Sequence, residues 1–399
     1  MTSLTSLSSP VVAKVFPADL ASVRAEDLEA AFEETPPLTV GIEEEVMLVD
    51  PDTLDLVPRA AEVLARLDGD PRFKPELPAS QLEILTEPVA DAAEAVGALA
   101  GGRRDLAAAA ASVALPLTVG VHPFAAGDGE LAPGERYERT AERYGRIARR
   151  QLVAALQVHV AVGGAARTLA VYNALRSHLP ELAALAANAP FYAGEDSGLA
   201  SVRPAIATLL PRQGVPPALE SWERFAAELR WGAATGAVTE PRLWWWELRP
   251  HPTFGTLEVR VPDSQTTIAE ATGIVATVQA LVAWLAARHD AGERLGAAPT
   301  WRIEENRFSA LSRGVEGGMA NLETGALEPT RERLRRLLDL LEPVADRLGT
   351  GPLLAGARPL VEVNGAIRQR DLARDRDLRA MTATLAERFS ATERGTRGA

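Results

Sequence analysis

The stretch VGIEEEVML, residues 40–48, alternates in a way that decides the fold. Side chains alternate across a β-strand, so residues two positions apart share a face. Glu43 and Glu45 therefore share one face, while Glu44 shares the other with aliphatic side chains. Two carboxylates at i and i+2 lie about 7 Å apart along the backbone. Their oxygens can converge on one or two divalent ions, so the strand predicts a metal-binding face backed by a core-facing stripe.

Three further segments repeat this arrangement, over residues 81–87, 157–163 and 256–261. Each carries polar side chains on one face and aliphatic side chains on the other. If all four strands belong to one sheet, the metal-capable residues of its open face are Glu43, Glu45, Glu83, His159 and Glu258. Hard oxygen ligands with few nitrogens favour Mg²⁺ or Mn²⁺ over Zn²⁺. The alternative is an ordinary solvent-facing surface, but such a surface would carry Lys, Thr and Ser freely.

One-sided strands that alternate with helices favour an α+β fold, with a curved and mainly antiparallel sheet covered by helices on one face. Further strands are expected over residues 115–121 and 243–249. The expected helices span residues 60–67, 90–113, 135–156, 169–187, 268–288, 331–348 and 371–389. Residues 1–36 read as a poorly ordered N-terminal extension, and residues 37–399 as a single catalytic domain.

Composition excludes several classes of function. The 399 residues carry a formal net charge of −12, which argues against a broad nucleic-acid surface. There is no cysteine, so disulfides, thiolate metal sites and cysteine nucleophiles are excluded. Lys14 and Lys74 are the only lysines, and neither lies in a P-loop string. Any phosphate chemistry would therefore use arginine, metal or backbone amides.

No segment argues for export or membrane insertion. The first ten residues lack the basic region of a signal peptide. The most apolar stretch, residues 271–287, is interrupted by Thr, Gly and Gln and is shorter than the roughly 20 residues of a spanning helix. A buried helix and a cytoplasmic protein without membrane contact are expected.

Arginines supply the opposite charge. A guanidinium binds carboxylate or phosphate oxygens through two parallel hydrogen bonds, although a structural ion pair is the ordinary alternative for each arginine alone. Arg260 shares a strand face with Glu258, and this pair is the best candidate for phosphate contact. Arg203 and Arg249 lie near prolines in loops or strand ends. A helix expected from about residue 301 adds Asn306, Arg307 and Arg313.

A row of arginines at helical spacing follows residue 135. It could form a basic patch for nucleic acid. Glu135 with Arg139, and Glu142 with Arg146, stand four residues apart, so a salt-bridged exposed face is favoured.

Seven strings occur in a familiar order: TVGIEEEVMLVD (39–50), SQLEILT (80–86), GVHPF (120–124), ERYER (135–139), SVRP (201–204), RPHPTFGTLEVRV (249–261) and ENRF (305–308). Together they resemble the bacterial carboxylate–amine ligases, also called the glutamate–cysteine ligase type 2 family, from about residue 38 to about residue 365. That family is similar in its catalytic core to glutamine synthetase, a curved antiparallel sheet whose glutamates hold metal ions.

The resemblance implies a role for each matching residue. The metal ligands would be Glu43, Glu45, Glu83, His159 and Glu258, with Glu258 and Arg260 as the catalytic pair. The residues that would face substrate or nucleotide are Arg203, Arg249, Asn306, Arg307 and Arg313. Gln157 departs from the pattern, because many relatives have histidine there, and glutamine is a poorer metal ligand.

The implied reaction joins a carboxylate to an amine. ATP would transfer its γ-phosphoryl group to the carboxylate, the amine would attack the acyl phosphate, and Mg²⁺ (or Mn²⁺) held by the glutamates would cancel charge between the two anions. Glutamate and cysteine are the substrates that the family name suggests. The partners are therefore small molecules, and a homo-oligomer is one expectation. Two other readings stay open: a metal-dependent hydrolase that uses the same glutamates, and a non-catalytic metabolite-binding protein.

Overall fold

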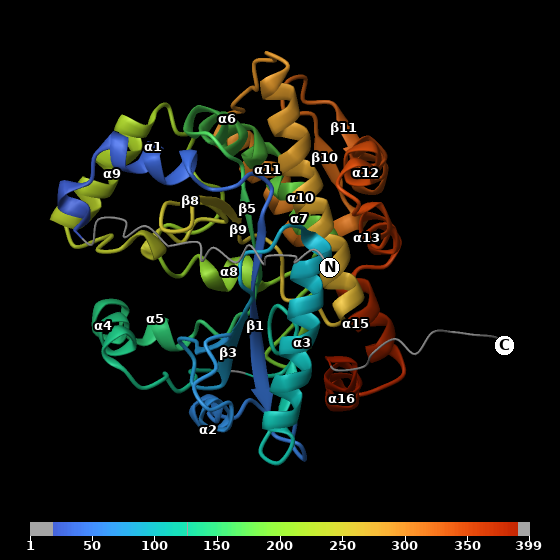
Figure 1. The fold of residues 1–399 in the computed structure, drawn as a ribbon. Coiled ribbons are helices and arrows are strands. Elements are labelled where there is room, and N and C mark those ends of the chain that lie inside the picture. The colour runs from blue at the N-terminus through green and yellow to red at the C-terminus, as the bar shows by residue number, and fades with distance from the viewer. Residues whose placement is uncertain (1–18, 126, 390–399) are drawn as a thin grey trace, which may run out of the picture.

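The computed structural model describes residues 19–125 and 127–389, and its centre is one seven-stranded sheet (Figure 1). Strand neighbours follow the order β2-β3-β1-β5-β9-β8, with β4 paired to β1, and every pairing is antiparallel. The strands are β1 (Val40–Val49), β2 (Phe73–Pro75), β3 (Gln81–Leu85), β4 (Leu115–Leu117), β5 (Leu156–Ala161), β8 (Leu248–His251) and β9 (Thr256–Val259). Two small hairpins lie outside this sheet: β6 (Phe191–Tyr192) with β7 (Glu195–Asp196), and β10 (Gly318–Ala320) with β11 (Leu327–Pro329).

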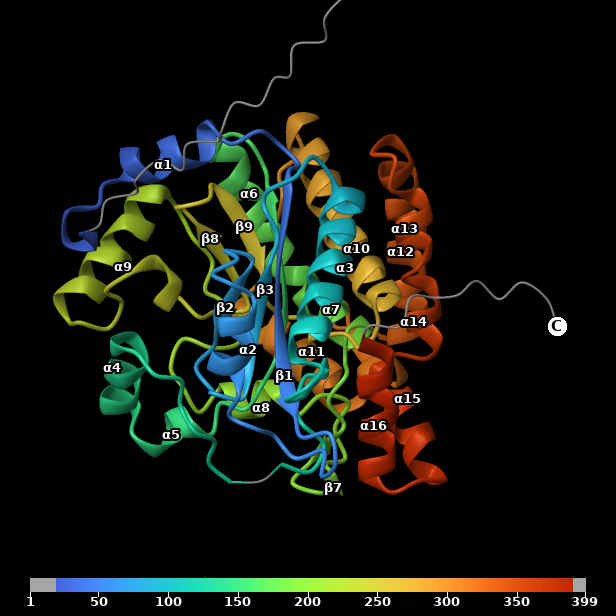
Figure 2. The same cartoon turned by 60° about the horizontal axis from the view of Figure 1, so that its bottom comes forward.

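Helices α3 (Ala92–Ala110) and α10 (Ile268–Asp290) run along one face of the sheet, and α12 (Thr330–Arg347) and α13 (Gly351–Ala355) lie outside α10 (Figures 1 and 2). Helices α4 (Glu135–Tyr144) and α5 (Arg146–Arg149) lie on the opposite side of the sheet in both views. The other helices are α1 (Ala25–Glu33), α2 (Ala60–Arg66), α6 (Ala165–Leu175), α7 (Leu179–Leu185), α8 (Arg203–Ala207), α9 (Trp222–Ala234), α11 (Thr300–Arg313), α14 (Arg358–Glu362), α15 (Gly365–Arg374) and α16 (Leu378–Phe389), with 3-10 turns η1 (Leu20–Ser22), η2 (Arg176–His178), η3 (Pro241–Leu243) and η4 (Gly314–Glu316).

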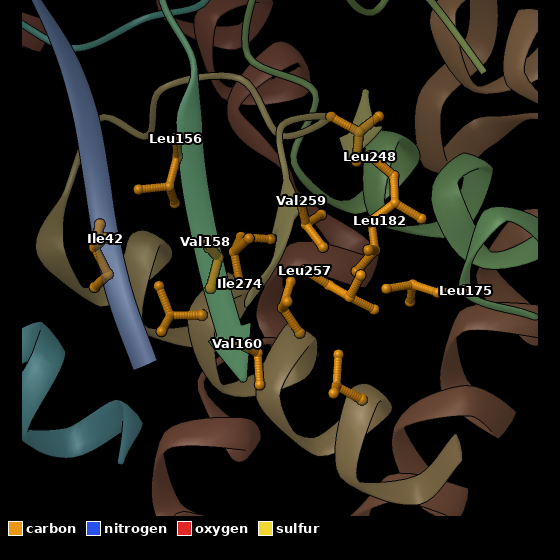
Figure 3. Packing of buried hydrophobic residues seen from close by; sticks show 14 of the residues in the cluster. Ile42, Leu156, Val158, Val160, Leu175, Leu182, Leu248, Leu257, Val259 and Ile274 are labelled. Atoms are coloured by element: carbon orange, nitrogen blue, oxygen red, sulfur yellow. The ribbon is translucent and has the colours of Figure 1, made fainter. Parts of the chain in front are cut away.

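The aliphatic stripes of the strands form the core against α10 (Figure 3). Ile42, Val158 and Val259 come from three neighbouring strands and are completely or almost completely buried. Ile274 of α10 packs in the same cluster. The predicted α+β fold, with one-sided antiparallel strands covered by helices, is confirmed.

Helix α10 has the length and apolar composition of a membrane span, but 78% of its most apolar window is buried inside the protein. A capping box starts the helix, in which the Thr267 side chain accepts from the Glu270 amide while the Glu270 carboxylate accepts from the Thr267 amide. Its buried Gln279 donates to the Leu38 carbonyl oxygen and accepts from the Ala92 amide. The predicted buried helix is thus confirmed and runs two residues further, to Asp290.

The expectation of a poorly ordered extension is wrong for residues 19–36. Helix α1 packs on α6 and α9, Leu28 and Phe32 are fully buried, and the Phe32 ring stacks on Trp222 at 4.8 Å. The partners that bury α1 come from distant parts of the chain, so a local pattern could not reveal them. Residues 1–18 lie outside the described residues, and the single domain over residues 37–399 stays a prediction.

Several predicted elements are shorter than expected. The helix predicted over residues 135–156 breaks at Gly145, whose φ is 58°, and ends at Arg149, before β5. The helices predicted over residues 169–187 and 371–389 are each divided into successive elements. The strand predicted over residues 243–249 begins only at Leu248, and residues 241–243 form a 3-10 turn ahead of it. Helical composition continues across these breaks, whereas the backbone geometry does not.

Candidate active site

The register of the sheet gathers the predicted acidic residues on its open face. Residues directly opposite in an antiparallel pair point to the same side. Glu45 lies opposite Glu83, and Glu258 lies opposite both His159 and Arg249. Glu43 and Glu258 are 215 residues apart in the sequence, yet their side chains meet on the same face of the sheet.

Two clusters of possible ligand atoms form on this floor. Glu43, His159 and Glu258 make one, called here the histidine cluster. Glu45, Glu76 and Glu83 make the other, called the carboxylate cluster. Within each cluster the ligand atoms lie within 4.8 Å of one another. All five predicted ligands are thus placed in the clusters, and Glu76 is an addition; their role as metal ligands stays a prediction.

His159 has the geometry of a ligating histidine. Its Nε2 lies 3.4 Å from Glu43 Oε1 and 3.9 Å from Glu258 Oε2, yet this buried nitrogen has no hydrogen-bond partner. Its other nitrogen, Nδ1, is 3.0 Å from Thr256 Oγ1. Metal-binding histidines are commonly held in this way through the second nitrogen. An unpartnered nitrogen aimed at two carboxylates fits a divalent cation.

The histidine cluster carries its own compensating charge. Glu258 is fully buried and pairs with Arg249, whose Nη2 lies 3.0 Å from Oε1, and with Arg260. Burial opposes ionisation of Glu258, but the two guanidinium groups outweigh it and hold its pKa well below the usual range. Burial likewise opposes ionisation of Glu43, yet the neighbouring His159 lowers the pKa of Glu43 to about 2. Both carboxylates are therefore ionised at neutral pH.

The carboxylate cluster has less compensation, because Arg260 and Arg203 lower the pKa of Glu45 without outweighing its burial. Glu45 accepts hydrogen bonds from the Ala155 amide and Gln157 Nε2, both at 2.8 Å. Among the described residues, no arginine or lysine forms an ion pair with Glu45, Glu76 or Glu83. Burial, reinforced by the neighbouring Glu76, raises the pKa of Glu45 to about 7, and burial with Glu43 raises the pKa of Glu83 well above its usual range. A divalent cation would supply the missing positive charge.

Gln157 connects the two clusters. Its amide nitrogen donates to Glu45, while its carbonyl oxygen accepts from Arg260, which also binds Glu258. The residue that departs from the family pattern thus acts as a hydrogen-bonded bridge between the carboxylate cluster and Arg260.

The raised pKa of Glu45 makes metal binding depend on pH. The unfolded carboxyl titrates near 4.3, so between about pH 4.3 and 7 the folded, metal-free protein holds more protons than the unfolded chain. The contribution of Glu45 to stability should therefore fall as the pH rises through this window. A bound cation displaces these protons, so affinity for Mn²⁺ should rise with pH up to about 7.

Calorimetric titration with Mn²⁺ in two buffers of different ionisation enthalpy would measure the protons released. Glu45→Gln should release fewer protons than the wild type at pH 6, and Glu332→Gln, an exposed change on α12, should match the wild type. Affinity that does not change between about pH 5 and 8 would contradict this assignment.

A cavity of about 400 Å³ opens above the clusters. Its lining adds residues that the sequence patterns missed: Lys74, Glu76, Arg136, Arg242, Trp245 and His251. Lys74 and Glu76 belong to or follow a three-residue strand, which is too short to show an alternating pattern. Arg136 stood in the row interpreted as an exposed face. That interpretation fits Arg139, which pairs with Glu135 at 3.3 Å, whereas Arg146 pairs with Asp128 rather than Glu142.

Arg203 and Arg249 reach the site, but both are already engaged. Arg249 lines the large cavity and is held by Glu258. Arg203 Nε binds Asp263 Oδ1 at 2.7 Å and lines a smaller adjoining cavity of about 80 Å³ together with Glu45 and Arg260. This small cavity therefore lies between Arg203 and Arg260.

The three predicted residues of α11 line neither of these two cavities, and their contact with substrate or nucleotide stays a prediction. Asn306 Nδ2 donates to the Ala320 carbonyl oxygen, and its Oδ1 accepts from the Ala320 amide. Arg307 makes a bidentate ion pair with Glu247, and Arg313 ends the helix in an exposed position. Asn306 thus braces neighbouring backbone, and Arg307 braces Glu247, which itself lines the small cavity.

Comparison with known proteins gives consistent matches. The family model described as glutamate-cysteine ligase family 2 (GCS2) matches residues 39–389. A Rubrobacter xylanophilus protein provisionally named glutamate–cysteine ligase 2-3 is 36% identical over 90% of this chain and 99% of its own length. A Frankia alni protein provisionally named glutamate–cysteine ligase 2-1 is 33% identical over 91% of this chain and 98% of its own length.

Two solved structures share the fold. The Francisella tularensis glutamate–cysteine ligase in complex with AMP aligns with a TM-score of 0.66 and 14% identity, over 90% of this chain and 89% of that one. A bifunctional glutathione synthetase from Pasteurella multocida gives the same TM-score and identity, over 93% of this chain and 54% of that one. At this level of identity the likeness concerns the fold alone.

Proposed function

Because the chain belongs to glutamate–cysteine ligase family 2, we propose that it is an ATP-dependent carboxylate–amine ligase acting on glutamate and an amine such as cysteine. The observation that carries the proposal is the pair of acidic clusters on one sheet face, bridged by Gln157 and Arg260. Arginines form ion pairs with Glu258 of the histidine cluster, while no described arginine or lysine forms an ion pair with the carboxylate cluster. That division suits a site that must bring two anions together.

The proposed reaction has two steps. A carboxylate oxygen of glutamate attacks the γ-phosphorus of ATP, which gives an acyl phosphate and releases ADP. The amine then attacks the acyl carbon, phosphate leaves, and the amide loses a proton. Divalent cations held by the two clusters would neutralise charge between the nucleotide and the carboxylate.

The side chains of the site serve this chemistry through position and charge. Arg260 lies between both clusters and faces the small cavity, where it can stabilise negative charge on the transferred phosphoryl group. Its pKa is raised by Glu258 and Glu45 despite burial, so it stays charged. Gln157 keeps its guanidinium in place. No enzyme nucleophile is required, which agrees with a chain without cysteine.

Hydroxylamine trapping tests the proposal. The protein is incubated with ATP, Mg²⁺ and glutamate, hydroxylamine replaces the amine, and hydroxamate and ADP are measured. We expect both products in equal amounts, and neither when Mg²⁺ is omitted. If the protein forms no ADP with any amino acid of a panel, the proposal of a ligase is overturned. Phosphate release without hydroxamate would favour a hydrolase.

A further inference from the structure

Lysine is almost absent from this chain, and its position is therefore informative. The sequence holds 42 basic residues, of which only Lys14 and Lys74 are lysines. Within residues 19–125 and 127–389, Lys74 is the single lysine, and it lines the cavity above the two acidic clusters. Arginine serves at every other described basic position, so an ammonium group stands only at the site.

Lys74 lies on β2 directly opposite Glu83 of the carboxylate cluster. It is exposed, and the described residues offer it no ion pair. Three of the four arginines that line the large cavity are engaged: Arg249 and Arg260 with Glu258, and Arg242 with Glu240. The fourth, Arg136, is exposed and lies over the Tyr137 ring. Among the described residues, Lys74 and Arg136 are therefore the two cations of this cavity that no ion pair holds, and Lys74 is the one on the sheet beside the carboxylate cluster.

Lys74 also stands where two cavities meet. A neighbouring cavity of about 260 Å³ runs along the first half of β1 and shares Glu43, Lys74, Leu85 and Phe254 with the large one. Its lining is mostly apolar, and Phe254, which is 45% exposed, stacks on the His251 ring at 4.4 Å. A cavity with a mostly apolar lining beside an exposed aromatic ring suits a planar base.

We propose that Lys74 binds the phosphate chain of the nucleotide where it passes from the apolar cavity to the acidic clusters. This assignment rests on the proposed function. An ammonium group is a compact charge on a flexible stem, whereas Arg242, Arg249 and Arg260 are held by carboxylates. Lys74 can therefore follow a phosphoryl group as it moves toward the substrate carboxylate.

Amine acetylation provides a test that is independent of turnover. Lys74 precedes Pro75, so trypsin leaves this bond intact and the peptide over residues 73–103 has the same ends with or without the label. ATP with Mg²⁺, at about ten times its dissociation constant, should slow labelling of Lys74 about 10-fold, because only the free fraction reacts. Tripolyphosphate with Mg²⁺ should also protect Lys74, whereas adenosine and glutamate should not.

Variants separate a phosphate contact from a structural role. Lys74→Met should weaken ATP binding, measured by calorimetry, by roughly 10- to 100-fold, as expected for a lost hydrogen bond to a charged group. Lys74→Arg should recover part of this loss. Arg104→Met, which removes an exposed cation outside the cavities, should bind ATP like the wild type.

The outcomes distinguish this assignment from the proposed function. A wild-type protein that binds no ATP would overturn both. ATP binding that leaves Lys74 fully reactive would overturn only the phosphate contact, and protection by glutamate alone would assign Lys74 to the carboxylate substrate instead.

Discussion

Glu43→Gln should abolish ligase turnover while the protein stays folded. Glu43 contacts His159 across the histidine cluster, has no arginine partner, and its side chain is 18% exposed. The amide would therefore remove one cation ligand without leaving a buried guanidinium unpaired. We expect a fall of roughly 10³-fold in kcat/KM in the hydroxamate assay, the scale for losing an electrostatic group in a catalytic site. Thermal unfolding of the metal-free variant should resemble that of the wild type.

Glu258→Gln should lose activity to the same extent but should also lose stability. Arg249 and Arg260 both pair with this fully buried carboxylate, so the variant leaves the buried Arg249 and the partly buried Arg260 without their counterion. Breaking a buried pair in this way costs about 3–5 kcal/mol in the free energy of unfolding, which urea denaturation would measure.

The contrast between the two variants is the informative result. Glu332→Gln, an exposed change on α12, controls for the loss of one negative charge and should change neither activity nor stability. Full hydroxamate formation by Glu43→Gln would refute the ligand assignment. A stable Glu258→Gln protein would show that the arginines find other partners.

The two acidic clusters show how far the sequence can be read. Alternation along each strand placed Glu43 and Glu83 on polar faces, because a strand has only two sides. The order of strands is different: it depends on which hydrogen-bonding edges meet, and nothing local predicts that β1 lies between β3 and β5. The division into two clusters follows from that order. Glu76 was not predicted, because it follows a strand of three residues, which is too short to show an alternating pattern.

Other residues show a different limit. Asn306 and Arg307 are polar types at a matching string, and type alone does not say whether a side chain faces a ligand or braces the backbone. Helix α1 is acidic and weakly patterned, yet the rings and aliphatic chains of α6 and α9 bury it. The wrong expectation for α1 comes from tertiary contacts that override local character.

The middle glutamate of the Glu43–Glu45 run faces the core, where it meets Arg103 of α3. Arg103 Nη2 lies 2.5 Å from Glu44 Oε1 and Nε lies 2.7 Å from Oε2, and both side chains are almost completely buried. Arg103 also donates to the carbonyl oxygens of Gln265 and Thr266, which precede α10. A strand that slipped by one residue would exchange its two faces. The Glu44–Arg103 ion pair therefore keeps Glu43 and Glu45 on the side of the strand that faces the cavity.

Arg103→Met should lower the free energy of unfolding by about 3–5 kcal/mol, because Glu44 would be buried without its counterion. Glu44→Gln should also be destabilising, since Arg103 would keep its charge in the core. The double variant should lose less than the sum of the single losses, because neither charge remains to be compensated. Urea denaturation of all four proteins completes the cycle. If the losses in the free energy of unfolding of the two single variants add up in the double variant, the ion pair does not couple these residues. If the Mn²⁺ affinity is also unchanged in every variant, the ion pair does not orient the strand.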